Sequence, residues 1–201
     1  MNTQDVWQRR IPSPSRPTPK HFLVFLLLIA IGAVTGTFGS IAIPVGHGVT
    51  GFWPAIVVQV LGGIWFGMWG VLAGVIFPFI SNTLAGAEPY VSFWYLPSNF
   101  IQGFLPALVF RVLKVDPRLR SPRDWFHYLW SGAVVNNFLG ALWAVTALRS
   151  LGLITVSNIP LFFSSWIIGN GVPAFILGVI FLKLLSPKII NHPTFCRGWW
   201  A

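Results

Sequence analysis

GFWPAIVVQVLGGIWFGMWGVLAGVIFPFISN, residues 51–82, is the stretch that decides the fold, because none of its residues is charged. A helix that crosses the hydrocarbon core of a bilayer needs roughly 20 residues. The stretch is therefore too long for one span at ordinary tilt and about long enough for two short spans. The Gly62-Gly63 pair and residues 65–68 mark where two such spans would meet.

The basic residues outside this stretch distinguish one span from two, since cations collect on the cytoplasmic side of membrane proteins. One span would place a basic loop outside. Two spans, at about 52–65 and 68–83, place that loop and the basic C-terminal residues in the cytoplasm and leave Arg149 as the only cation outside. The sequence therefore predicts two spans. The basic residues concerned are Lys114, Arg118, Arg120 and Arg123 in the loop, and Lys183, Lys188 and Arg197 near the C-terminus.

The composition is that of an integral membrane protein: 55% of the residues are hydrophobic, 8% are charged, and the mean hydropathy is +0.72. A soluble domain carries about 25% charged residues. We expect an all-α bundle of about six transmembrane helices, multi-pass in a prokaryotic inner membrane, with both termini cytoplasmic. The expected spans are 22–43, 52–65, 68–83, 98–113, 125–148 and 160–184. Positive-inside topology accounts for the net charge of +9, so no nucleic-acid partner is expected.

Three segments follow from this reading. Residues 1–20 are basic and rich in proline, which prevents a continuous helix, and we expect a disordered cytoplasmic tail. Residues 21–185 form the transmembrane domain, and residues 186–201 form a short cytoplasmic tail that ends in an interfacial Trp199-Trp200 anchor. Within the domain, residues 84–97 are an aromatic outer loop that fits either an interfacial belt or a lid.

Ionic chemistry has no place in the predicted spans. Arg111 and Lys114 are at a span end, where their side chains can snorkel to the headgroups, and no other Asp, Glu, Lys or Arg lies deeper. Proton pumps and voltage sensors need ionisable groups at depth. The histidines are scattered, and no nucleophile–base pair or phosphate-binding loop occurs. We therefore expect no enzyme activity, no metal site and no cofactor.

Neutral polar side chains remain as the candidate ligand-binding groups. Buried amides cost free energy in hydrocarbon unless they are paired, and several amides with nearby tryptophans resemble the lining of a small-molecule pocket. Hydrogen bonding between helices explains each amide taken singly, and the aromatic belt explains each tryptophan taken singly. The predicted ligand-binding residues are Gln59, Asn99, Gln102, Asn136 and Asn170, with Trp143 or Trp166 stacking on the ligand.

A stripe of small residues runs along the first span. Gly32, Gly36 and Ser40 recur every fourth residue, so they share one helical face and allow close backbone contact. Two interpretations stay open: packing of this helix inside the bundle, and an interface with another subunit.

The layout resembles a known family. Six short spans in about 200 residues, cytoplasmic termini, the stripe on the first span and the run GGIWFGMWGVLAG at residues 62–74 are similar to the substrate-binding S-components of energy-coupling factor (ECF-type) vitamin transporters. The resemblance implies capture of a small solute from the outer side. It also implies that Gly32, Gly36 and Ser40 dock a membrane coupling subunit driven by ATPases. Membrane sensor modules that precede kinase or phosphatase domains have a similar layout.

The predicted function is therefore capture of a small neutral or aromatic solute by a membrane subunit of a transporter. Two alternatives belong to other classes. One is a non-enzymatic structural or assembly subunit of a larger membrane complex, and the other is a stand-alone sensor module with a separate signalling partner. All three interpretations require the lipid bilayer and at least one membrane-protein partner.

Overall fold

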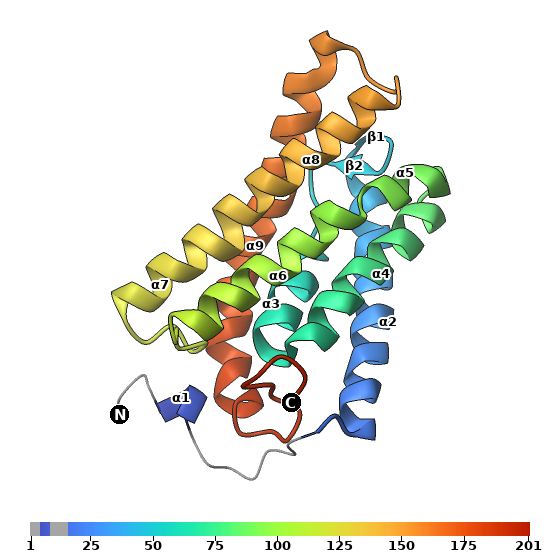
Figure 1. Ribbon diagram of the computed structural model, residues 1–201. Helices are drawn as coiled ribbons and strands as arrows, with labels where there is room; N and C mark the ends of the chain where they lie inside the picture. Colours follow the sequence, from blue (N-terminus) through green and yellow to red (C-terminus); the bar gives the residue numbers. More distant parts are fainter. Residues whose placement is uncertain (1–4, 9–15) are drawn as a thin grey trace.

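The computed structural model describes residues 5–8 and 16–201, and the chain forms a helical bundle with one small β-hairpin (Figure 1). The antiparallel hairpin pairs β1 (Pro44–Gly46) with β2 (Val49–Thr50). The helices are α1 (Asp5–Gln8), α2 (Pro19–Ala42), α3 (Ile56–Phe66), α4 (Met68–Leu84), α5 (Pro89–Trp94), α6 (Leu96–Val112), α7 (Pro122–Tyr128), η1 (Leu129–Val135), α8 (Asn136–Ser150), η2 (Val156–Asn158) and α9 (Ile159–Ile189).

The bundle has two distinct ends. The β-hairpin, α5 and η2 lie at one end, which we call the hairpin end (Figure 1). The helix α1, the C-terminus and the loop between α6 and α7 lie at the opposite end, which we call the tail end.

The uncharged stretch at residues 51–82 forms two helices, as predicted. α3 and α4 meet at Gly67, whose φ of 58° lies in the region that glycine adopts without strain. Gly70 of α4 packs directly on the backbone of Gly62 in α3, and a Cβ atom on Gly70 would overlap the Gly62 carbonyl. The predicted break near residues 65–68 is confirmed, and its glycines let the two helices approach closely.

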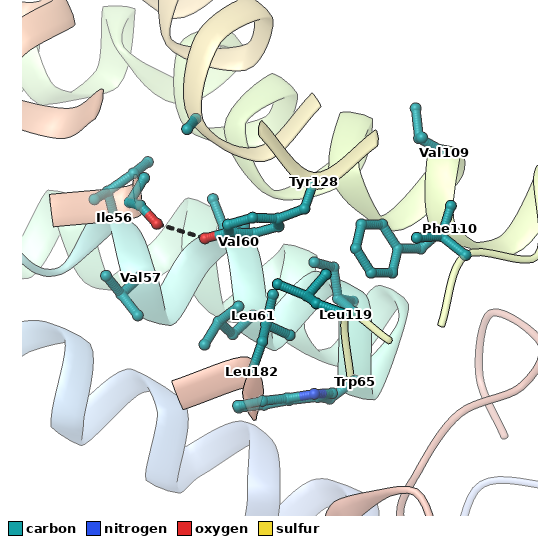
Figure 2. Close-up of a cluster of buried hydrophobic side chains, with 14 of the residues drawn as sticks. Ile56, Val57, Val60, Leu61, Trp65, Val109, Phe110, Leu119, Tyr128 and Leu182 are labelled. Atoms are coloured by element: carbon teal, nitrogen blue, oxygen red, sulfur yellow. Dashed lines mark hydrogen bonds between the residues drawn. The ribbon is translucent and has the colours of Figure 1, made fainter. Parts of the chain in front are cut away.

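The central helix of the fold is α3. Val60 and Leu61 lie in a cluster with Phe110 of α6, Tyr128 of α7 and Leu182 of α9 (Figure 2). The Tyr128 hydroxyl donates a hydrogen bond to the Ala174 carbonyl of α9. Three helices that are distant in sequence are thereby fixed around α3.

The small-residue stripe of α2 packs inside the chain. A Cβ atom on Gly32 would overlap the ring of Phe77, and one on Gly36 would overlap Ser81, both on α4. Ser40 is buried as well. The stripe thus serves close packing of α2 on α4, and a coupling subunit cannot reach it while α4 covers it. The expected docking role of Gly32, Gly36 and Ser40 is corrected accordingly.

Three helical segments are long and apolar enough to cross a membrane: Pro19–Ala42, Pro122–Ser150 and Val156–Ile189. The second is α7, the π-helical η1 and α8 in succession, and its start is capped by Ser121, whose hydroxyl accepts from the backbone N–H of Asp124. Large apolar side chains of α2, such as Val34 and Phe38, are exposed. These features indicate a membrane protein. α3 and α4 are shorter apolar helices.

Both chain ends are ordered where the structure describes them. Trp7 of α1 is buried, and its indole Nε1 donates to the Val115 carbonyl at 2.8 Å. At the C-terminus, the backbone N–H of Cys196 donates to the Trp65 carbonyl, and that of Met68 donates to the Trp199 carbonyl. The expected disordered tail therefore includes a docked helix at residues 5–8, and residues 186–201 pack on the bundle. Residues 1–4 and 9–15 of the expected tail lie outside the described residues.

Arg111 differs most from its sequence-based expectation. Its side chain does not snorkel: it is buried and donates to the backbone carbonyls of Gly63, Ala107, Cys196 and Gly198 at 2.7–3.1 Å. The guanidinium also lies over the rings of Trp7 and Trp199. One cation thus joins α3, α6 and the C-terminal segment at the tail end.

Candidate functional site

A polar cavity of about 20 Å³ lies beneath the β-hairpin. Its lining comes from the hairpin, the segment before α3, and the helices α4, α6 and α9. The side chains that line it are neutral, and most are polar or aromatic. They belong to Gly48, Val49, Thr50, Trp53, Pro78, Asn82, Asn99, Trp166 and Asn170.

Gly169 of α9 brings two parts of this lining together. A Cβ atom at this position would collide with the Thr50 carbonyl, so only glycine lets the segment after β2 lie directly on α9. In that position the Trp53 backbone N–H donates to the Gly169 carbonyl at 2.7 Å. Trp53 is consequently placed beside Asn170, although more than a hundred residues of chain separate them.

Four polar atoms of the lining side chains have no hydrogen-bond partner in the described part of the chain. Three are donors, namely Trp53 Nε1, Trp166 Nε1 and Asn99 Nδ2, and the fourth is the acceptor Asn170 Oδ1. These four residues are only 3–7% exposed. Leaving a buried polar group unpaired costs about 1–3 kcal/mol, and native structures contain few such groups. The four residues that hold these atoms all line this one cavity.

Gln59 of α3 holds Asn99 from the side away from the cavity. Its Nε2 donates to the Gly74 carbonyl at 2.6 Å and to Asn99 Oδ1 at 3.4 Å. A Cβ atom on Gly74 would lie 3.0 Å from Gln59 Cγ, so glycine at this position gives the amide its room. Gln59 does not line the cavity, and its role is to position Asn99.

Gln102 and Asn136 lie in a separate amide layer between α6 and α8. Gln102 Nε2 donates to Asn137 Oδ1 at 2.8 Å, Asn136 Nδ2 donates to the Gln102 carbonyl at 3.3 Å, and Asn137 Nδ2 donates to the Ala133 carbonyl at 2.8 Å. The predicted ligand-binding role of Gln102 and Asn136 is not supported by this placement. Their hydrogen bonds hold two helices together.

Trp143 is also outside the cavity. Its ring is 42% exposed on α8, and its Nε1 donates to the Trp94 carbonyl at 2.9 Å beside an apolar groove of about 320 Å³. Of the two tryptophans predicted to stack on a ligand, only Trp166 lines the cavity.

The prediction missed Trp53, Asn82 and Thr50 as lining residues. Asn82 carries a recognisable signal, since it is an amide at the end of an apolar run. Trp53 and Thr50 carry no local signal, because their place depends on contact with Gly169. The structure thus unites Asn99, Trp166 and Asn170 from the predicted set and adds these three.

The side chains that line the cavity are all neutral. Within residues 5–8 and 16–201, no three His, Cys, Asp or Glu side chains lie close enough together to hold a metal ion. No family model, curated protein or solved structure matches the chain. The geometry of the cavity is therefore the basis for a function.

Proposed function

We propose that this protein is a membrane-embedded subunit that captures a small neutral solute in the cavity beneath the β-hairpin, as the substrate-binding part of a transporter. One observation carries the proposal: four side chains that each hold an unpaired buried polar atom, those of Trp53, Asn99, Trp166 and Asn170, line a single cavity. A purely structural bundle gains nothing from leaving them unpaired, because apolar side chains there would pack at lower cost.

The proposed topology is six spans with the hairpin end outside and the tail end in the cytoplasm of a prokaryotic inner membrane. The placement of basic residues supports it. The loop between α6 and α7 lies at the tail end and carries Lys114, Arg118 and Arg120, and Arg123 is at the start of α7. The C-terminal end of α8, which carries Arg149, lies toward the hairpin end. The solute therefore enters from outside.

The β-hairpin acts as the cover of the site. A cavity of about 20 Å³ has room for little more than one water-sized group, so a solute is admitted only when the cover moves. The Tyr95 hydroxyl ties the cover down by donating to the His47 carbonyl at 2.8 Å. The tip of the hairpin, at Gly46, His47 and Gly48, has positive φ throughout.

The proposed partner is a membrane coupling subunit with ATPases, as in the ECF-type transporters that the sequence resembles. Because α4 covers the glycine stripe of α2, such a partner binds to other surfaces of the chain.

The test is purification of the tagged full-length chain from its native membrane in mild detergent, with mass spectrometry of retained proteins and small molecules. We expect a bound neutral solute and an ATPase-containing complex. The Asn99→Leu and Asn170→Leu variants should lose the solute, and the matched control Trp143→Phe should retain it. Association with a large complex of another kind, with no solute retained, would contradict the proposal and favour an assembly subunit.

A further inference from the structure

We propose that the cavity selects solutes through an amide group, a carbonyl beside an N–H, in preference to carboxylates and ammonium ions. The inference rests on the proposed function and gives its site a chemical class. It comes from the roles that the unpaired atoms of the lining can play.

The donors require an oxygen acceptor on the solute. An indole N–H donates and cannot accept. Trp53 and Trp166 can therefore pair only with an acceptor on the solute. Both indoles are buried, and neither N–H has a partner among the residues that the structure describes. A ligand carbonyl oxygen has two lone pairs and can accept from both.

The orientation of Asn99 follows from a chain of contacts. The Gly74 carbonyl can only accept, so the end of the Gln59 amide that faces it must be the Nε2 donor. The same Nε2 donates to Asn99 Oδ1. The carbonyl end of Asn99 is thereby engaged, and its Nδ2 becomes the third donor offered by the lining.

Asn170 Oδ1 is a buried acceptor of the lining that has no partner among the residues that the structure describes. It requires a hydrogen-bond donor on the solute, an N–H or an O–H. An amide supplies a strong acceptor and a donor in one plane and stays neutral at all ordinary pH values, and it matches the donors and this acceptor together. A ketone satisfies the donors alone.

Charge excludes the nearest alternatives. Every side chain that lines the cavity is neutral. A carboxylate could accept from the N–H donors, but it has no hydrogen to donate to Asn170 Oδ1, and no cation offsets its charge. An ammonium ion would face the N–H groups of two indoles and an amide, which repel it. The lining therefore favours a neutral amide over ions of the same size.

The experiment compares four compounds of nearly equal size: benzamide, acetophenone, benzoate and benzylamine. Their binding to the purified full-length chain in nanodiscs is measured by calorimetry. We expect benzamide to bind about tenfold more tightly than acetophenone, since one hydrogen bond is worth about 1 kcal/mol or slightly more, and to bind more tightly still than either ion. Trp53→Phe and Trp166→Phe keep an aromatic ring, remove one donor, and should each weaken benzamide binding about tenfold. Trp143→Phe should not.

Melting temperatures show whether each variant is folded. A second measurement compares benzamide with acetophenone on the Asn170→Leu variant, which should bind the two compounds equally. Stronger binding of benzoate or benzylamine, weakened by Trp53→Phe, would overturn the amide class but leave the site intact. Benzamide binding that changes only in Trp143→Phe would place it outside the cavity and overturn the inference. If none of the four compounds binds, the inference also fails, and the solute retained from native membranes decides the proposed function independently.

Discussion

The cavity and the amide layer contain the same kinds of side chain but differ in what those side chains contact. In the layer, Gln102, Asn136 and Asn137 bond to one another and to backbone across α6 and α8. In the cavity, Asn99 and Asn170 each leave a polar atom unpaired beside two unpaired indoles. The layer also leaves one buried polar atom, Gln102 Oε1, without a partner in the described part of the chain. Residue type therefore does not distinguish the amides that pack helices from the amides that line the cavity; their place in the tertiary structure does.

The largest expected effect comes from removing both cavity amides. The double variant Asn99→Leu/Asn170→Leu should weaken benzamide binding about a hundredfold, because two hydrogen bonds are lost. Its melting temperature should be unchanged or higher, since two unpaired buried polar atoms, Asn99 Nδ2 and Asn170 Oδ1, are removed. Calorimetry and thermal unfolding in detergent measure the two effects. A large drop in stability would show that the cavity amides also hold helices together and would weaken the contrast.

The amide layer should respond in the opposite way. Asn137→Ala removes the acceptor of Gln102 and the donor to Ala133. We expect a loss of about 1–2 kcal/mol in the free energy of unfolding, with unchanged benzamide affinity in the folded fraction. Thermal unfolding followed by circular dichroism provides the measurement. If Asn137→Ala instead lost affinity for benzamide and kept its free energy of unfolding, the amide layer would be part of the binding site.

Gln59 hydrogen-bonds to its neighbours, as the amides of the layer do, but one of its partners is the cavity residue Asn99. In Gln59→Leu, Asn99 loses the contact that orients it, and benzamide affinity should fall about fivefold, less than in Asn99→Leu. Combining the two substitutions should add nothing, since Gln59 acts through Asn99. Additive losses measured in that double-mutant cycle would refute the positioning role.

The cover of the cavity should affect rates more than affinity. Tyr95→Phe removes the tie to His47, worth about 1 kcal/mol. Association and dissociation of benzamide should both become several-fold faster, with little change in the dissociation constant. Stopped-flow tryptophan fluorescence measures both rates. Unchanged rates would mean that solutes reach the cavity by another path.

The reactivity of Cys196 tests whether the C-terminal segment stays docked in each variant, and we expect the smallest effect here. Burial raises the pKa of its thiol to about 11, although the nearby Arg111 opposes this shift. At pH 8 the thiolate fraction is then about a hundredfold below that of a thiol with a pKa of 9, and only the thiolate reacts. Maleimide labelling should be slow in the wild type and in the cavity variants. Rapid labelling of the wild type would contradict the docked C-terminal segment.

Part of the site could be predicted from sequence. Asn99, Trp166 and Asn170 stand out as polar or aromatic residues in apolar segments, and all three line the cavity. Gln102 and Asn136 carry the same signal and lie elsewhere. The distinction depends on how far each helix is rotated about its axis, which the low amphipathic contrast of α6, α8 and α9 leaves undetermined.

Arg111 illustrates the same limit for a charge. Its position at a helix end near a basic loop predicts snorkelling, and in most membrane helices a cation there reaches the headgroups. In this protein the C-terminal segment folds back and offers carbonyls to the guanidinium. That contact joins residues 85 or more positions apart and has no local signature.

The sequence by itself determined the helical membrane character, the break between α3 and α4, and the absence of ionic groups from the lining of the cavity. Charge, hydropathy and glycine act locally, so their pattern is legible along the chain. Only the tertiary structure decided that Gly169 admits Trp53 beside Asn170, that Gln59 orients Asn99, and that the glycine stripe of α2 faces α4. These contacts join distant segments, and close packing of whole helices, not any local preference, selects them.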